Sequence, residues 1–296
     1  MSPILLGSFW MLLTTLSFVA LSVGVRALSS DIGAVEVLFF RCLIGVVIFV
    51  PWIAKNGIGV LRTSKFGKHA IRAVFMGVGM AFWFVAIGAL PLGDAIALHF
   101  TLPLFLIVFA AFFLKEKVDF SVWIATAIGF SGVLLILRPG FQEIDIAMFY
   151  VLLSGALYAG NHTITKVMST TESPNATAFY MNFLVLPGAA IALPFSWVMP
   201  EGHHVGWLLV VGISGSTAHI CLLRAFRYAD ANVLAPIDFL RLVFSAIAAW
   251  FLFGDVSDIW TWTGACVIFA AATFSTQRAR RIESKLGRNS AKVSGA

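Results

Sequence analysis

Polar side chains recur along one face of the apolar segment 146–168. Tyr150, Ser154, Tyr158 and Asn161 follow one another at steps of four, four and three residues. At about 100° per residue, such steps keep the side chains within an arc of roughly 80° on a helix. Aromatic rings that alternate with hydroxyl and amide groups could bind a planar or polar solute. The alternative is that the hydroxyls bond within their own helix or at helix-packing contacts.

A second polar group lies between residues 231 and 253. Asp238, Arg241 and Ser245 stand at positions i, i+3 and i+7, so the carboxylate and the guanidinium can meet on one helical face. Pro236 lacks an N–H and therefore predicts a kink one turn earlier. Arg241 could anchor a carboxylate or phosphate while Asp238 orients it or exchanges a proton. A purely structural ion pair is the open alternative, because buried pairs often only neutralise each other.

Two histidines and a tryptophan extend the set of candidate residues. His99 lies one turn before Pro103, and His219 lies in another apolar segment. A histidine inside a membrane can carry a proton because its charge changes near physiological pH, which makes protons a candidate coupling ion. A neutral histidine that only packs is the alternative at both positions. Trp83 is predicted either as a wall of the same cavity or as a core residue.

Ten apolar segments must position these groups. Hydrophobic residues make up 60% of the chain and charged residues 11%, with a mean hydropathy of +0.95. Soluble domains carry roughly 25% charged residues. Segments of about 20 apolar residues suit helices that cross a bilayer, because a helix satisfies its own backbone in lipid. The segments are 4–25, 33–53, 70–90, 93–114, 120–137, 146–168, 176–198, 205–226, 231–253 and 259–276. We expect an all-α integral membrane protein with ten transmembrane helices.

The ten segments form two similar sets of five. A shift of 140 residues aligns Trp10 with Tyr150 and Thr14 with Ser154, so Trp10 and Thr14 join the predicted binding residues. Since five is odd, the second set enters the membrane inverted, which is the plan of many secondary transporters. The expected organisation is a first five-helix repeat over 1–140, an inverted second repeat over 144–278 and a basic cytoplasmic tail over 279–296.

The basic residues predict the orientation. With the N-terminus in the cytoplasm, 15 of the 20 Lys and Arg residues fall in cytoplasmic loops or in the tail. Such a bias indicates that both termini face the cytoplasm. We expect a multi-pass protein of the bacterial inner (plasma) membrane. The basic residues behind this bias account for the formal net charge of +6. We interpret the basic tail as a topology and lipid-contact feature, and no nucleic-acid partner is expected.

Together these features resemble the ten-helix EamA-type family of the drug/metabolite transporter superfamily. The resemblance is carried, in order, by FFRCLIGVVIF, by ALPLGDAIALHFTLPLFLIVFAAFFLKEKV, by GFSGVLLILRPG and by ANVLAPIDFLRLVFSAIAAWFLFGDVSDIWTWTGACVIF. It covers nearly the whole chain except the tail, although Asp255 stands where Glu is more usual. The resemblance implies a secondary transporter of small metabolites with a central cavity between the halves, and it does not imply one substrate.

The sequence offers no signature of an enzyme or a cofactor site. HExxH, GxSxG and Walker patterns are absent, and Cys42, Cys221 and Cys266 lie in apolar segments without CxxC spacing. We expect neither catalytic residues nor a metal or cofactor. A membrane-embedded enzyme or scaffold is the alternative from another class.

The predicted function is alternating-access export of a small polar metabolite, such as an amino acid or a related compound. The resemblance equally allows uptake of a vitamin or nucleoside-like compound of the riboflavin or S-adenosylmethionine type. The expected partners are the small-molecule substrate and the lipid bilayer, with the oligomeric state open. The predicted substrate-binding residues are Trp10, Thr14, Trp83, His99, Tyr150, Ser154, Tyr158, Asn161, His219, Asp238 and Arg241.

Overall fold

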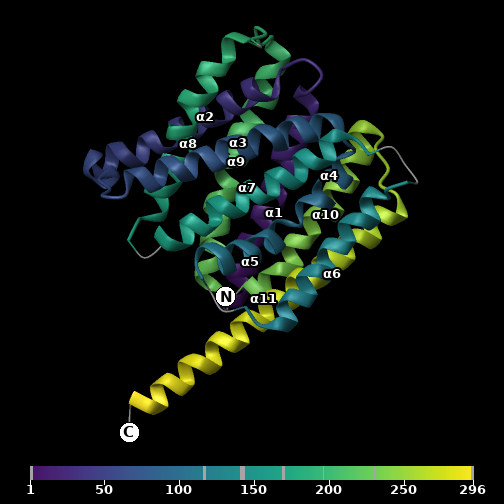
Figure 1. The fold of residues 1–296 in the computed structure, drawn as a ribbon. Helices are drawn as coiled ribbons and strands as arrows, with labels where there is room; N and C mark the ends of the chain where they lie inside the picture. The colour runs from purple at the N-terminus through teal and green to yellow at the C-terminus, as the bar shows by residue number, and fades with distance from the viewer. Residues whose placement is uncertain are drawn as a thin grey trace.

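The protein is a bundle of helices (Figure 1). A computed structural model describes residues 3–115, 118–140, 144–168, 171–195, 197–229 and 231–294, without the side chains of residues 174, 231–233, 235, 276 and 279–294. The helices are α1 (Pro3–Leu28), α2 (Ala34–Asn56), α3 (Phe66–Ala89), α4 (Leu92–His99), α5 (Leu102–Phe113), α6 (Phe120–Leu137), α7 (Ile146–Met168), α8 (Pro174–Ala192), α9 (Gly202–Tyr228), α10 (Ala231–Phe253) and α11 (Ile259–Ser294), with 3₁₀ helices η1 (Ile58–Leu61) and η2 (Leu193–Phe195). The predicted all-α fold is confirmed.

Eight of the described segments are long and apolar enough to cross a membrane, with α4 and α5 counted as one segment over Leu92–Phe113. The apolar part of α11, Ile259–Ser275, is shorter. Helix α7 has 23 residues but is not among the eight, because its polar stripe lowers its hydropathy. With α7 and α11 added, the bundle has the ten predicted crossings.

The connecting loops meet at two opposite ends of the bundle. Asp31, after α1, accepts a hydrogen bond from His204, at the start of α9, with 3.2 Å between Oδ2 and Nε2. Lys65, before α3, donates to the hydroxyl of Thr171, after α7, at 2.6 Å. The first loop of one half thus meets the second loop of the other half at each end. This crossing pattern is what an inverted repeat requires.

Helix packing repeats the same symmetry. Helix α1 packs against α9 and α10, and its counterpart α7 packs against α3 and α5. The counterparts α2 and α8 pack on each other, as do α6 and α11, which run side by side (Figure 1). Helix α11 continues beyond its apolar part to Ser294 and projects from the body of the bundle. The predicted pair of inverted five-helix repeats accounts for this arrangement.

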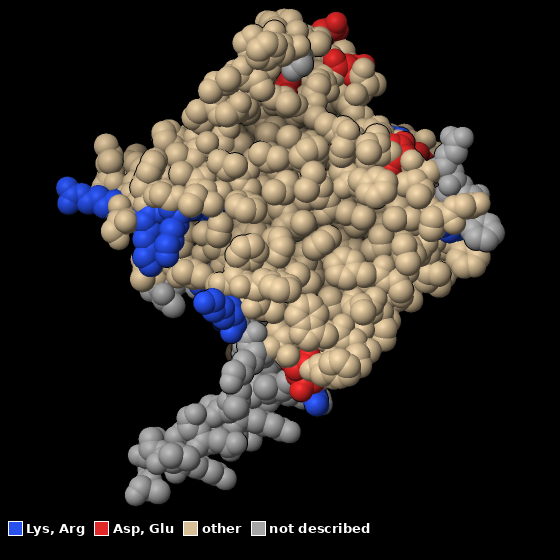
Figure 2. All heavy atoms as spheres, viewed as in Figure 1, with Lys and Arg blue, Asp and Glu red and all other residues tan. Residues whose placement is uncertain are grey.

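The two ends differ in charge. We call one the acidic end, defined by Asp31, Asp145, Glu201, Asp255 and Asp258, and the other the basic end, defined by Lys55, Arg62, Lys65, Lys68 and Lys115. Figure 2 shows a broad surface without charged side chains, with Lys and Arg mainly at its left and lower edges, and Asp and Glu mainly at its upper and right edges but also at the lower edge. Such an apolar band fits the hydrocarbon region of a bilayer.

The predicted fourth segment is broken where a single helix was expected. Pro103 has no N–H to donate to the carbonyl of His99, so the helical ladder stops there. Phe100 N–H donates to both Ile96 and Ala97 at 3.2 and 3.3 Å. Helix α5 then begins at Leu102. By contrast, α10 continues as one helix through Pro236, the site of the predicted kink.

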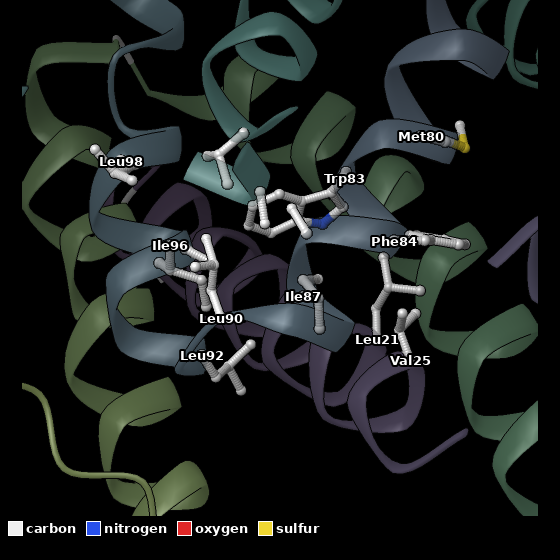
Figure 3. Packing of buried hydrophobic residues seen from close by; sticks show 14 of the residues in the cluster. Leu21, Val25, Met80, Trp83, Phe84, Ile87, Leu90, Leu92, Ile96 and Leu98 are labelled. Atoms are coloured by element: carbon white, nitrogen blue, oxygen red, sulfur yellow. The ribbon is translucent and has the colours of Figure 1, made fainter. Parts of the chain in front are cut away.

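Apolar side chains pack closely in the first half near its acidic end. Figure 3 shows Val25 of α1 beside Ile87 of α3, with Leu92 and Ile96 of α4 packed nearby. These four side chains are at most 1% exposed. Interiors packed in this way leave no void for a solute, so none can pass between α1, α3 and α4 unless these helices separate.

Candidate substrate cavity

A cavity of about 330 Å³ lies between the two halves. Its volume falls within the range of small-molecule sites, roughly 300–1,000 Å³. Six of the eleven predicted binding residues line it, namely Trp83, His99, Tyr158, His219, Asp238 and Arg241. The remaining lining residues include Phe18, Ser22, Arg41, Phe100, His162 and Phe226. The walls therefore combine aromatic rings with two guanidinium groups and one carboxylate.

Arg241 is held chiefly by aromatic faces. Its guanidinium carbon lies 4.8 Å from the ring centre of Phe100 and 5.5 Å from that of Phe18, within cation–π range. The predicted partner Asp238 is 3.8 Å away between Oδ2 and Nη2, which is too long for a hydrogen bond. The buried Nε has no hydrogen-bond partner among the described residues. Within the described residues, Arg241 is therefore held at the cavity wall by an ion pair and two ring faces rather than by hydrogen bonds.

An aromatic wall surrounds the break between α4 and α5. The ring centre of His99 lies 4.4 Å from that of Trp83 and 5.3 Å from that of Tyr158. The imidazole is 8% exposed, and its Nε2 has no partner in the described part of the chain. The ring therefore contacts Trp83 of the first half and Tyr158 of the second half. The wall offers stacking surfaces for a flat solute.

His219 has a defined tautomer. Its Nδ1 lies 2.9 Å from the carbonyl oxygen of Gly215. A carbonyl only accepts, so Nδ1 carries the hydrogen in the neutral ring and Nε2 is left as an acceptor. The imidazole also stands edge-on to Phe18, with 5.5 Å between ring centres.

Sequence reasoning missed His162, a third histidine of the cavity. The signal was present, because His162 follows Tyr158 by four residues and so shares its helical face. The predicted polar face instead included Asn161, three residues after Tyr158. Which of these two faces lines the cavity depends on the helices that pack against α7. The sequence of α7 alone does not show which helices these are.

The other five predicted residues lie at helix contacts in this conformation. Thr14 donates its hydroxyl to the carbonyl of Trp10 at 2.9 Å, and the ring of Trp10 lies 4.6 Å from the guanidinium carbon of Arg224. The ring of Tyr150 packs against Phe82 at 5.2 Å. Ser154 and Asn161 are buried, at 0% and 3% exposure. That these five contact cargo remains a prediction.

Arg41 is the largest addition to the predicted site. It lines the cavity at 2% exposure, and its Nη1 donates to Asn182 Oδ1 at 3.0 Å. Glu36, a conceivable partner on the same helix, instead accepts from the backbone N–H of Val198 at 3.1 Å. With the histidines neutral, Arg41 and Arg241 outnumber Asp238, so the described lining carries one formal positive charge.

The cluster of Asp31, His203 and His204 at the acidic end brings ligand-type atoms within 4.8 Å of one another. His204 Nδ1 accepts the backbone N–H of Glu201 at 3.0 Å, so Nε2 holds the ring hydrogen and donates it to Asp31. This hydrogen bond lowers the pKa of the Asp31 carboxyl. In this tautomer neither ring nitrogen of His204 has a free lone pair, and the hydrogen bonds join Asp31 to the start of α9.

A polar contact also holds the halves together at the acidic end. Arg26 of α1 donates to the carbonyls of Ile87 and Gly88, and its Nη2 lies 3.8 Å from Asp255 Oδ2. The same carboxylate oxygen accepts the backbone N–H of Leu92 at 3.3 Å. Asp255 belongs to the second half and the other residues to the first. The contact must therefore break when the acidic end opens.

Asp255→Ala is expected to open the acidic end more often. The lost contacts are worth about 1 kcal/mol, or roughly a five-fold change in the open population. The substitution Ser22→Cys, in the cavity wall, reports this opening as faster labelling by a membrane-impermeant maleimide. The rate is measured in right-side-out and inside-out vesicles, after subtraction of labelling in the parent without that cysteine.

The matched control for this experiment is Asp145→Ala. The Asp145 carboxylate lies at the same end but accepts the N–H of Ala147 in its own half, at 2.8 Å. Its loss should leave the labelling rate unchanged. Equal rates for Asp255→Ala and the parent would show that Asp255 does not hold the end closed.

The chain resembles known transporters over nearly its full length. The profile described as the EamA-like transporter family matches residues 5–138 and 145–277. The chain is 32% identical over 273 residues to the S-adenosylmethionine uptake transporter of Rickettsia felis, covering 91% of this chain and 92% of that protein. It is 31% identical over 278 residues to the riboflavin transporter of Vibrio cholerae, covering 92% and 93%.

A more distant relative and a solved structure agree with these matches. The pseudopaline exporter CntI of Pseudomonas aeruginosa is 27% identical over 270 residues, covering 90% of this chain and 94% of the exporter. One crystal structure at 18% identity shares the fold, with a TM-score of 0.63 over 94% of this chain and 98% of that one. The protein is a multi-pass membrane transporter of small metabolites rather than an enzyme. The chain belongs to the EamA-like transporter family.

Proposed function

We propose that the protein moves a planar metabolite rich in hydrogen-bond acceptors, neutral or anionic, through the cavity between its halves. The observation that carries this proposal is Arg241, whose guanidinium lines the cavity between the rings of Phe18 and Phe100 and forms an ion pair of 3.8 Å with Asp238. A flat heterocycle can stack on the aromatic walls while its oxygen or nitrogen acceptors meet the guanidinium. The two-fold packing of the halves supports alternating access by rocking.

The net positive charge of the cavity lining favours some of the solutes after which the relatives are named over others. S-adenosylmethionine carries a sulfonium and a net positive charge, which two guanidinium groups against one carboxylate oppose. The ring system of riboflavin is uncharged, flat and rich in carbonyl and nitrogen acceptors. The lining therefore favours a flavin-like or other vitamin-like cargo over a cationic one.

An amino acid is the second candidate. The 3.8 Å separation of Asp238 and Arg241 leaves room for the ammonium and carboxylate of a zwitterion to meet each charge. Export, the direction expected from the sequence, remains part of this proposal. The three cavity histidines are the groups by which a proton gradient could drive either direction.

The test is flux into proteoliposomes that contain the purified full-length protein. Labelled riboflavin, S-adenosylmethionine and a mixture of amino acids are compared, with and without a pH gradient and with the cargo loaded on either side. We expect riboflavin flux above that of empty liposomes and of S-adenosylmethionine. Flux of none of these solutes under any gradient would contradict the proposal, and preferred flux of S-adenosylmethionine would contradict the charge argument.

A further inference from the structure

We propose that Arg41 is a second anion anchor of the cavity, so that the preferred cargo carries a carboxylate or phosphate group. This inference rests on the proposed transport function and narrows its substrate class. Arg41 reaches the cavity from α2, whereas Arg241 reaches it from α10, so the two guanidinium groups belong to opposite halves.

The surrounding side chains fix the guanidinium in place. Asn182 of α8 accepts a hydrogen bond from Arg41 Nη1 at 3.0 Å through its Oδ1. Its Nδ2 donates to the carbonyl of Ala178 at 3.1 Å, which orients the amide with its oxygen toward Arg41. Asn182 is 1% exposed and Arg41 is 2% exposed. The orientation of Arg41 is therefore set before any cargo arrives.

Two glycines make room for this arrangement. A methyl group on Gly215 of α9 would stand 2.9 Å from Arg41 Nε. A methyl group on Gly45 of α2 would stand 2.7 Å from Asn182 Oδ1. Contacts this short do not occur between real Cβ atoms and their neighbours. Three helices are thus adapted at neighbouring positions to hold one guanidinium.

The arrangement supplies Arg41 with no opposite charge. Among the described residues, no carboxylate lies within salt-bridge distance of it, and the nearby sulfur of Cys42 is 3.9 Å from Nη1. Asp238, the acid of the lining, is paired with Arg241. A buried, uncompensated charge at membrane depth is costly, and such residues usually face a solute pathway. An anionic group on the cargo would provide the missing charge.

The alternative is that Arg41 only ties α2 to α8 through Asn182. The substitution Asn182→Asp separates the two roles, because it keeps the shape and the acceptor for Arg41, loses the donor to the Ala178 carbonyl, and adds the missing counter-charge. If Arg41 has only a structural role, the added carboxylate should leave the protein folded and cargo binding unchanged. If Arg41 binds an anionic group of the cargo, the added carboxylate should neutralise it and weaken binding of the anion.

The experiment measures equilibrium binding of labelled ligands to the purified full-length protein. Two planar pairs differ in charge: nicotinate against nicotinamide, and flavin mononucleotide against riboflavin. For at least one pair we expect the anion to bind the parent about 10- to 100-fold more tightly than its neutral partner. This preference should disappear in Asn182→Asp and Arg41→Gln and persist, weakened, in Arg41→Lys.

The control is Arg224→Gln, which removes a guanidinium that lies over Trp10 and does not line the cavity. It should keep the anion preference. The inference is overturned if neutral partners bind as tightly in both pairs, if no anion binds, or if the preference survives Asn182→Asp and Arg41→Gln. Failure of the transport proposal is a separate result, namely the absence of flux in proteoliposomes.

Discussion

Replacing Arg241 with alanine is expected to lower transport at limiting cargo concentration by about 10- to 100-fold. A hydrogen bond to a charged group contributes about 1.5–3 kcal/mol, which corresponds to this range. The substitution also removes the cation that stacks on Phe18 and Phe100. The measurement is initial flux of the identified cargo in proteoliposomes, with reconstituted protein quantified for each variant.

This substitution leaves Asp238, whose side chain is 29% exposed, as a partly buried charge without its partner, which is itself destabilising. A second protein with both Asp238→Asn and Arg241→Gln removes the pair together and should fold, while its transport falls as in the single variant. Arg224→Ala is the matched control, since it also removes a guanidinium from an aromatic face. Parental kinetics in the double variant would identify the pair as structural.

Gly132→Ala is expected to reduce the stability of the protein by about 1–3 kcal/mol, a typical cost of overpacking. Helices α6 and α11 touch through their backbones at this position. A methyl group on Gly132 would stand 2.8 Å from the carbonyl oxygen of Gly264, and one on Gly264 would stand 2.6 Å from that of Gly132. Backbone atoms cannot rotate aside, so the two helices must separate.

The measurement is equilibrium unfolding of the purified protein in mixed micelles. Gly188→Ala is the control, because a methyl group at Gly188 meets no described atom within 4 Å and improves helix propensity. It should leave stability unchanged or slightly raised. If Gly132→Ala unfolds at the same denaturant concentration as the parent, the close approach of α6 and α11 is not a source of stability.

The sequence predicted the fold well because its strongest signals are local. An apolar run of about 20 residues defines a membrane helix, and a repeat at about 140 residues defines the second half. The break at Phe100 was harder to predict. Pro103 and Pro236 look alike in sequence, yet α4 ends near the first and α10 continues through the second. Tertiary packing decides which proline interrupts a helix.

The site was predicted only in part, because only some of its contacts lie within one helix. Asp238 and Arg241 are three residues apart, so one helix brings them together. Arg41 and Asn182 are 141 residues apart and meet only because α2 packs on α8. Their glycine neighbours carry no pattern of their own. Contacts between the halves are therefore the part of the site that cannot be predicted from a single sequence.

The polarity of α7 has a consequence for biogenesis. This helix is not among those apolar enough to span a membrane by composition, and it is the first helix of the second half. Its partition from the translocon into lipid is therefore weakly favoured when it emerges alone. Its packing partners α3 and α5 precede it in the chain and can shield its polar face. Membrane assembly of the second half thus depends on a first half that is already in place.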